Sequence, residues 1–411
     1  MRILLIHGFY QTRGGEDAVV ENEHAMLTRR GHSVTPFFVH NTDIDTYSYY
    51  EKLMLLPRII YNRKTADKLA ALLSRQHFDI VHIHNIWPLL SPSLFFLLNR
   101  KNIPYLQTIH NYRYIVPNAM LFKEDVDPTT HRLTIAPRPL NSFRNSCLLT
   151  AAYALTAELV RRTRVIDDGC GALQVLNRFG YDIHRQRFNA DKLVIRGNFL
   201  PDSVVTKMSP SPNRETYLYL GRLSEEKGVG TLIDAFSRLD TACGLDVAGT
   251  GPSAAALRQR SAHDRRIRFL GVVDGDRKHA LLARAKALIV PSEWQEVFPV
   301  TIMEGSFSAT PVIAARIGGL PDMVLEGRTG RLFESGDVED LYNALRWCET
   351  HPEQLRRMGA FARTYAASHF GESESYAQLI DIYDTLIEKA KQRRRHDPRR
   401  SARGVHPADG G

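Results

Sequence analysis

The sequence predicts an α/β protein in which two doubly wound, Rossmann-like domains with parallel sheets face each other across a cleft. The chain opens with a strand, a glycine-containing loop, a helix and a second strand. A Pro/Ser-rich stretch interrupts it at residues 201–214, and a second alternating series begins at Tyr217. Alternating strands and helices are typical of parallel sheets covered by helices on both faces. A length of 411 residues fits roughly two or three domains.

In the first half, short apolar runs predict strands, and apolar positions at helical spacing predict the helices between them. We expect strands at Arg2–Ile6, Ser33–Val39, Asp79–Asn85, Pro104–Asn111, Ala172–Leu176 and Leu193–Phe199. We expect helices at about Glu16–Arg30, 43–75, Pro88–Asn99 and 147–165. The last is rich in alanine and leucine, so it lies either in the core or, as an amphipathic helix, on a membrane. The stretch Tyr112–Arg138 is irregular and long, and such loops are usually functional or disordered.

The second half repeats the alternation after the predicted linker at residues 201–214. We expect strands at Tyr217–Leu223, Gly244–Gly249, Ile267–Gly271, Lys286–Val290 and Pro311–Ala315. We expect helices at Gly230–Leu239, Pro252–Ser261, Arg277–Ala285, Pro299–Phe307, Leu341–Thr350 and Gln354–His369. The predicted domains are residues 1–200 and 215–372. A helix at 373–392 would pack back towards the first domain, and a disordered basic tail at 393–411 would follow it.

Composition limits where the protein works. The four cysteines lack the spacing of a disulfide framework or a zinc site, which favours a reducing cytoplasm. The apolar run at the N-terminus is too short for a signal peptide, and no run reaches the roughly 18 residues of a membrane-spanning helix. We therefore expect a cytoplasmic protein that binds a membrane at most peripherally.

Basic residues are concentrated at the C-terminus. Residues 389–411 contain eight Lys and Arg against two Asp, so they carry +6 of the net charge of +9. Such a tail either solubilises the protein or is attracted to anionic lipid headgroups, at about 1 kcal/mol per basic residue near the surface. Nucleic-acid binding is not expected, because the tail has no interleaved aromatic residues that could stack on bases.

Two glutamates mark a candidate ligand site in the second half. Glu296 lies in the loop after the strand at Lys286–Val290, and Glu304 lies in the first turns of the next helix. In open α/β sheets, ligands bind at the carboxyl ends of the strands, where carboxylates can accept hydrogen bonds from sugar hydroxyls. Taken alone, the pair is better explained as one solvated glutamate and one capping glutamate, because glutamates are common on helices.

Cations and glycine turns lie at other strand ends. Arg222 and Lys227, in GRLSEEKG, are five residues apart between a strand and a helix. Two cations beside a helix N-terminus can bind a diphosphate, although an isolated Arg/Lys pair is usually only solvated. Glycine turns at Gly249-Thr250-Gly251 and Gly318-Gly319 would add backbone amides beneath phosphates and sugar.

Histidines mark two strands of the first half. His82 and His84 share one strand face, where packing is favoured over metal ligation because no third ligand is implied nearby. His110 ends its strand, so we expect it to point into the ligand crevice. The first glycine loop, Gly14-Gly15, permits close approach of a bound group but lacks the GxGxxG of a dinucleotide site, which disfavours a dehydrogenase.

Several short motifs occur in a characteristic order: GGED, TIHN, GRLSEEKG, VAGTGP, FLG and PSEWQEVFP with MEG. In this order they resemble the retaining glycosyltransferases of the group 1, or family 4, glycogen synthase-like superfamily, over about residues 1–390. The resemblance implies the GT-B fold and transfer of a sugar, with retention, from a UDP- or GDP-sugar to a saccharide or lipid-linked saccharide. Asn111 stands where many relatives carry aspartate, and residues 140–172 match no motif, so the acceptor stays open.

The resemblance also implies residue roles. Arg222 and Lys227 would bind the donor diphosphate and offset the charge of the leaving group. Glu304 would accept hydrogen bonds from the ribose, and Glu296 would contact the transferred sugar. His110 would face that sugar near the reacting centre. The remaining expected donor-site residues are Gly15, Gly249, Gly271, Phe298 and Pro299.

No metal or other cofactor is expected, because the basic pair would replace a divalent cation. Asp274-Gly275-Asp276 spells a DxD motif, but its place between a strand and a helix favours helix capping. The basic tail, the Tyr/Arg-rich stretch 47–63 and the helix at 147–165 suggest a lipid-linked acceptor in bacterial surface-polysaccharide assembly. The alternatives are a nucleotide-sugar epimerase on the same scaffold and a non-catalytic nucleotide-sugar-binding protein.

Overall fold

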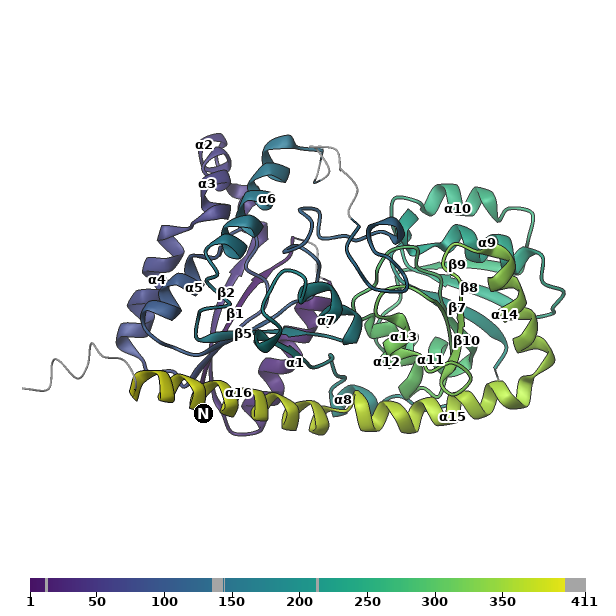
Figure 1. Cartoon of the computed structure of the whole chain (residues 1–411). Helices are drawn as coiled ribbons and strands as arrows, with labels where there is room; N and C mark the ends of the chain where they lie inside the picture. The colour runs from purple at the N-terminus through teal and green to yellow at the C-terminus, as the bar shows by residue number, and fades with distance from the viewer. Residues whose placement is uncertain (12–13, 135–142, 144, 212–213, 396–411) are drawn as a thin grey trace, which may run out of the picture.

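Two parallel sheets lie side by side in the protein (Figure 1). The structure is a computed structural model that describes residues 1–11, 14–134, 143, 145–211 and 214–395. Each sheet has six strands, and every pairing between named strands is parallel. The predicted α/β class with two Rossmann-like domains is therefore confirmed.

The first sheet comes from the N-terminal half and has the strand order β2-β1-β3-β4-β5-β6. Its strands are β1 (Arg2–Phe9), β2 (Ser33–His40), β3 (Ile80–Ile83), β4 (Tyr105–Thr108), β5 (Gly171–Val175) and β6 (Leu193–Ile195). Its helices are α1 (Gly15–Arg29), α2 (Tyr49–Leu53), α3 (Leu55–Ile60), α4 (Arg63–Arg75), α5 (Ser93–Arg100), α6 (Cys147–Arg162) and α7 (Arg178–His184). The strand order reverses between β1 and β3, which is where open α/β sheets bind ligands.

The second sheet has the order β12-β11-β10-β7-β8-β9 and reverses between β7 and β10. Its strands are β7 (Thr216–Leu220), β8 (Gly244–Ala248), β9 (Ile267–Gly271), β10 (Ala285–Val290), β11 (Val312–Ala315) and β12 (Gly330–Phe333). Its helices are α9 (Val229–Ser237), α10 (Ala254–Arg260), α11 (Gly275–Arg284), α12 (Val300–Phe307), α13 (Leu320–Met323), α14 (Val338–Thr350) and α15 (Pro352–His369).

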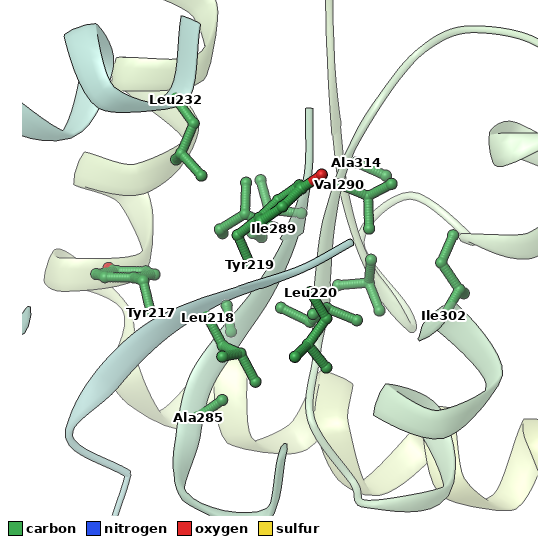
Figure 2. Close-up of a cluster of buried hydrophobic side chains, with 14 of the residues drawn as sticks. Tyr217, Leu218, Tyr219, Leu220, Leu232, Ala285, Ile289, Val290, Ile302 and Ala314 are labelled. Atoms are coloured by element: carbon green, nitrogen blue, oxygen red, sulfur yellow. The ribbon is translucent and has the colours of Figure 1, made fainter. Parts of the chain in front are cut away.

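Helices cover the second sheet, so its strands are apolar along most of their length. Figure 2 shows Leu218 and Leu220 of β7, Ile289 of β10, Leu232 of α9 and Ile302 of α12 in one buried cluster. This packing fixes β7 and β10 next to each other, with Leu218 opposite Leu288. The loops that leave these two strands therefore start from rigid positions.

The chain crosses between the two sheets twice, at adjacent places. It first crosses near Leu200 and returns after α15, where the Leu200 amide donates a hydrogen bond to the Phe370 carbonyl at 3.0 Å. The last helix, α16 (Glu372–Arg395), then runs along the first domain (Figure 1). There Leu379 and Tyr383 are buried against Ile3 and its neighbours. The C-terminal helix thus fastens the second domain to the first.

The stretch 43–75 is not the single helix that its sequence predicts. It contains a 3₁₀ turn (Asn41–Thr46), then α2, α3 and α4. Tyr61 is extended and ends α3, and the Asn62 side chain accepts a hydrogen bond from the Thr65 amide at 3.2 Å, which starts α4. A local cap therefore prevails over the helical periodicity.

Other boundaries also shift. α5 begins at Ser93 rather than Pro88, and α7 and β12 form in stretches without a predicted element. A short helix, α8 (Asp202–Val205), lies within the predicted linker, of which residues 212–213 are outside the described part. α16 extends to Arg395, so residues 393–395 are helical rather than tail, and residues 396–411 lie outside the described residues. Within the described residues, no helix is both long enough and apolar enough to cross a membrane.

Replacing Leu379 by alanine should destabilise the protein by about 2–5 kcal/mol, because Leu379 is fully buried where α16 meets the first sheet. Urea unfolding at neutral pH measures the effect. Thr385→Ala, at an exposed position of the same helix, is the matched control and should leave the midpoint within error. Equal midpoints for the two variants would show that α16 does not stabilise the first domain.

Candidate active site between the two sheets

Two adjoining cavities lie in the cleft between the sheets. The larger has a volume of about 710 Å³ and the smaller about 340 Å³. Both are lined by Gly15 at the start of α1, by Gly221-Arg222 after β7, and by Val300-Thr301 at the start of α12. The site therefore forms where the switch points of the two sheets face each other.

The loop after β7 carries the two predicted cations. Arg222 is exposed and lines both cavities, and among the described residues no carboxylate forms an ion pair with it. Lys227 lines the smaller cavity and lies 5.0 Å from the centre of the Trp294 ring. Gly228 has φ +65°, and a Cβ there would lie 1.9 Å from the Pro291 carbonyl oxygen. Only glycine fits, so the turn that orients Lys227 depends on it.

Glu296 lies in the smaller cavity and is only 5% exposed. Its Oε1 accepts hydrogen bonds from Lys227 Nζ at 2.7 Å and from Ser292 Oγ at 2.6 Å. Its backbone carbonyl accepts a hydrogen bond from the Gly319 amide at 2.7 Å. These contacts hold the carboxylate in one orientation and bring together the two predicted residues Lys227 and Glu296.

Glu304 lines the larger cavity and is also 5% exposed. Its partner is Lys278 of α11, which donates a short hydrogen bond to Glu304 Oε1. Lys278 was not predicted as a site residue, because a single lysine in a helix carries no motif. One signal in the sequence could have indicated it. Lys278 lies two residues after the DxD stretch, in the first turns of a helix at the carboxyl edge of the sheet. Asp274 occupies the N-cap position of α11, without a capping hydrogen bond from its side chain.

Two helix N-termini flank the cavities. Pro299 is the N-cap of α12, and the first backbone N–H groups of a helix have no partner within it. Across the cleft, α1 begins at Gly15, and a Cβ on Gly15 would lie 3.8 Å from the Val300 side chain. Both helix dipoles therefore direct their positive ends at the cleft, which favours an anionic ligand.

The remaining predicted donor-site residues differ in position. Phe298 lines the smaller cavity, and its ring packs edge-on against Phe370 at 5.8 Å, where the chain crosses between the sheets. Gly249 lines the larger cavity with φ +141°, and a Cβ there would clash with the Gly221 carbonyl oxygen at 1.8 Å. Gly271 lines neither cavity. It supports Gly249 from behind, since its carbonyl accepts the Gly249 amide hydrogen bond at 2.7 Å.

His110 lines the smaller cavity, as its place at a strand end predicts, and a buried network lies behind it. His110 Nε2 is 3.0 Å from His84 Nδ1, and His84 Nε2 is 3.0 Å from Glu23 Oε2. Arg196 Nη1 donates to the other Glu23 oxygen at 2.7 Å. The negative charge of the Glu23 carboxylate, 3.0 Å away, favours the proton of neutral His84 on Nε2 electrostatically, and with this tautomer His110 Nε2 donates to His84 Nδ1. The Nδ1 atom of His110 is then a hydrogen-bond acceptor.

Burial keeps these histidines neutral. It lowers the pKa of His110 to about 4, that of His84 to about 3 and that of His82 to about 4. Burial alone would raise the pKa of Glu23, but the permanent positive charge of Arg196 beside it holds that pKa well below its ordinary range. The network therefore presents an uncharged imidazole to the cleft and keeps its single negative charge behind it.

Glu23 also corrects the expectation that His82 and His84 have no third ligand nearby. The candidate ligand atoms of Glu23, His82 and His84 all lie within 4.8 Å of one another. The donor set does not suit a metal ion, however. Arg196 already balances the charge of Glu23, and His82 is engaged at both nitrogens, by Tyr383 at 2.7 Å and Thr108 at 2.8 Å. The three residues therefore form a hydrogen-bonded and ion-paired network.

Two Rossmann-like domains that enclose a basic, glutamate-lined cleft define the GT-B class of glycosyltransferases. Comparison with known proteins agrees with this class. Residues 206–365 match the family described as Glycosyl transferases group 1, and residues 13–160 match Glycosyltransferase Family 4. Glycogen synthase from Mycobacterium tuberculosis is 28% identical over 311 residues, which are 74% of this chain and 68% of that protein.

Solved structures show the same fold. Sucrose-phosphate synthase from Thermosynechococcus elongatus superposes with a TM-score of 0.70 at 18% identity, over 94% of this chain and 99% of that one. HepE from Anabaena in complex with UDP gives a TM-score of 0.68 at 15% identity, over 94% and 100% of the two chains. The two family matches together span residues 13–160 and 206–365, so this chain is a group 1 glycosyltransferase, and the solved structures show that its fold is GT-B. The family and fold that the resemblance implied are therefore confirmed, and they favour transfer over the epimerase alternative.

The free energy of unfolding should fall as the pH is lowered from about 6.5 towards about 4. Unfolded histidines take up protons near their ordinary pKa of 6.5, whereas folded His82, His84 and His110 do not. The unfolded state thus binds more protons in this window, and stability rises with pH. Glu23 acts in the same direction only below its ordinary value of 4.5.

Urea unfolding at several pH values between 4.5 and 7 measures the slope, to which each histidine contributes up to about 1.4 kcal/mol per pH unit. His84→Asn should reduce the slope by up to one histidine's share. His263→Asn, at an exposed position, is the control and should keep the wild-type slope. If His84→Asn also keeps that slope, His84 is not buried as a neutral group.

Proposed function

We propose that this glycosyltransferase moves a sugar from a nucleoside diphosphate-sugar, with UDP or GDP as the nucleotide, to a saccharide or lipid-linked saccharide with retention of anomeric configuration. One observation carries the proposal: Arg222, Lys227 and the N-terminus of α12 converge on a cleft that also contains Glu296 and Glu304. HepE, which has the same fold, was solved in complex with UDP, and this supports a nucleoside diphosphate as part of the donor.

The two cavities suggest how a donor lies. The larger, which contains Glu304 and Gly249, would take the nucleoside, with the Glu304 carboxylate accepting hydrogen bonds from the ribose hydroxyls. Arg222 lines both cavities and would hold the diphosphate at their junction, together with Lys227 and the α12 amides. The sugar would then extend into the smaller cavity towards Glu296 and His110.

Retention follows if the acceptor hydroxyl attacks on the face that the diphosphate leaves. The bond from the anomeric carbon to the phosphate oxygen breaks, a bond to the acceptor oxygen forms, and the hydroxyl proton moves to the departing phosphate. Arg222 and Lys227 stabilise the charge that develops on this leaving group. Glu296 is held by Lys227 and Ser292, so its role is to bind sugar hydroxyls rather than to act as a nucleophile.

His110 assists as a neutral group. Its Nδ1 can accept a hydrogen bond from a hydroxyl of the transferred sugar, whereas a protonated imidazole would compete with the basic pair for the donor. No metal ion or other cofactor takes part in the proposed reaction, because the cations of the chain and the helix N-termini supply the positive charge. The basic C-terminal segment supports work at the cytoplasmic membrane face, on a lipid-linked acceptor of bacterial surface-polysaccharide assembly.

Arg222→Ala and Lys227→Ala should each reduce transfer by about 10²–10³-fold, since each removes a preorganised charge at the leaving group. Release of UDP or GDP from a panel of nucleotide-sugars and acceptors measures the rate. Arg356→Ala, which removes an exposed cation far from the cleft, is the control and should keep the wild-type rate. Near-normal turnover in both cleft variants would refute the diphosphate assignment.

Transfer should be unchanged by excess EDTA and should not rise with added Mg²⁺ or Mn²⁺, because the proposed charge stabilisation comes from protein groups. The product should have the anomeric configuration of the donor, which the coupling constant of its anomeric proton in an NMR spectrum reports. Activity that EDTA abolishes and Mn²⁺ restores would refute metal independence, and an inverted product would refute the proposed mechanism.

A further inference from the structure

A third cavity lies in the first domain, outside the two cavities of the cleft. It has a volume of about 410 Å³ and lies between α2–α3 on one side and α6 on the other. These three helices stand together at one end of the domain (Figure 1). The lining is mostly apolar and includes Leu56, Ile59, Trp87 and Leu149. Nothing in the proposed donor site uses this cavity.

A buried cation projects into this apolar setting. Arg113 is 9% exposed and lines the cavity, with its guanidinium carbon 4.6 Å from the centre of the Tyr153 ring and 5.1 Å from that of Phe143. Its Nη1 donates to the Pro117 carbonyl at 3.2 Å, but its buried Nε has no hydrogen-bond partner in the described part of the chain. Within the described residues, no carboxylate pairs with it. A buried, unpaired cation is costly unless an anion joins it.

A second residue that lines the cavity also has an unsatisfied polar atom. Asn41 is 4% exposed and lines the cavity. Its Nδ2 donates to the Trp87 carbonyl at 3.0 Å, whereas no described residue forms a hydrogen bond with its buried Oδ1. The cavity thus combines one unpaired cationic donor and one unpaired acceptor with apolar walls, which suits an amphipathic ligand with an anionic, protonatable group.

Apolar side chains and a lysine also lie at the solvent-exposed edge of the cavity. Leu53 of α2 and Leu148 of α6 line the cavity and are 52% and 65% exposed. On the same helices, Tyr49, Tyr50 and Leu155 are 87%, 68% and 56% exposed. An apolar chain could leave the cavity over these side chains. Lys52, which also lines the cavity, adds a second positive charge near the opening.

The cavity also borders the cleft. Tyr10 lines it, and the Tyr10 hydroxyl donates to Glu16 at 2.7 Å, while Glu16 lines the smaller cleft cavity beside His110. Asn111, which follows His110, donates to the Tyr10 hydroxyl at 3.3 Å. Tyr10 and Asn111 therefore connect this cavity to the cleft by direct contacts, and a sugar attached to the ligand would pass beside them to reach the reacting centre.

We propose that this cavity is the acceptor subsite and that it binds a hydrocarbon chain bearing a phosphate, with the phosphate on Arg113 and the chain along Leu53 and Leu148. Arg113 is then an acceptor-binding residue, and the attached saccharide reaches past Tyr10 into the cleft. The inference rests on the proposed function, since it assigns the acceptor of that same reaction. The proposal also gives a role to Asn111, which stands where many relatives carry aspartate: it would contact the acceptor.

Decyl phosphate, kept below its micelle concentration, is the probe, and isothermal titration calorimetry measures its binding to the full chain. Arg113→Met keeps the volume and removes the charge, so it should weaken decyl phosphate binding about ten- to hundredfold and leave 1-decanol binding unchanged. Arg113→Lys should recover part of the affinity. Arg162→Met, on the exposed face of α6, is the matched control and should bind like the wild type.

Leu53→Ser tests whether the hydrocarbon chain of the ligand lies along Leu53. Leu53 is exposed, so this substitution should not affect folding. It should weaken decyl phosphate and 1-decanol alike. Stabilisation of each variant by UDP and by GDP in a thermal-shift assay reports the donor site separately. If neither nucleotide stabilises the wild type, the proposed function fails. If one does, but decyl phosphate does not bind or binds Arg113→Met as tightly as the wild type, only this inference is overturned.

Discussion

The cleft exists because the chain crosses between the two sheets twice at the same place. The Leu200 amide bonds to the Phe370 carbonyl, so the outgoing and returning segments hold each other. Beyond the crossing, Arg196 donates to the Ser375 carbonyl at 3.0 Å, which ties the start of α16 to the first domain. The carboxyl ends of the two sheets must therefore face each other, and every other feature of the site builds on that constraint.

Arg196 connects the contacts between α16 and the first domain to the candidate active site. The same guanidinium that binds α16 also pairs with Glu23, which lies behind His84 and His110. Charge neutralisation at Glu23 lets a carboxylate remain ionised in a buried place, and it fixes the direction of the hydrogen bonds between the histidines. The position of His110 in the cleft thus depends on how the C-terminal helix docks, more than 200 residues further along the chain.

The excess positive charge of the cleft follows from which charged side chains form ion pairs there. Lys227 pairs with Glu296, and Lys278 pairs with Glu304, so each buried carboxylate has its own cation. Arg222 has no such partner among the described residues, and two helix N-termini point at the same space. The excess positive charge therefore lies where the cavities join, while the glutamates remain available as hydrogen-bond acceptors on either side.

The alternation of strands and helices, the parallel class and the group of residues at the carboxyl edge could all be predicted from local sequence patterns. Arg222, Lys227, Glu296, Glu304 and His110 could be grouped in advance because all strands of a parallel sheet end at the same edge. The contact of Lys278 with Glu304 and that of Glu23 with His84 could not be predicted in this way. Nor could the place of Arg113 in an apolar cavity, where no carboxylate among the described residues pairs with it. These contacts join helices and loops distant in sequence, so they depend on packing between elements, which local periodicity does not encode.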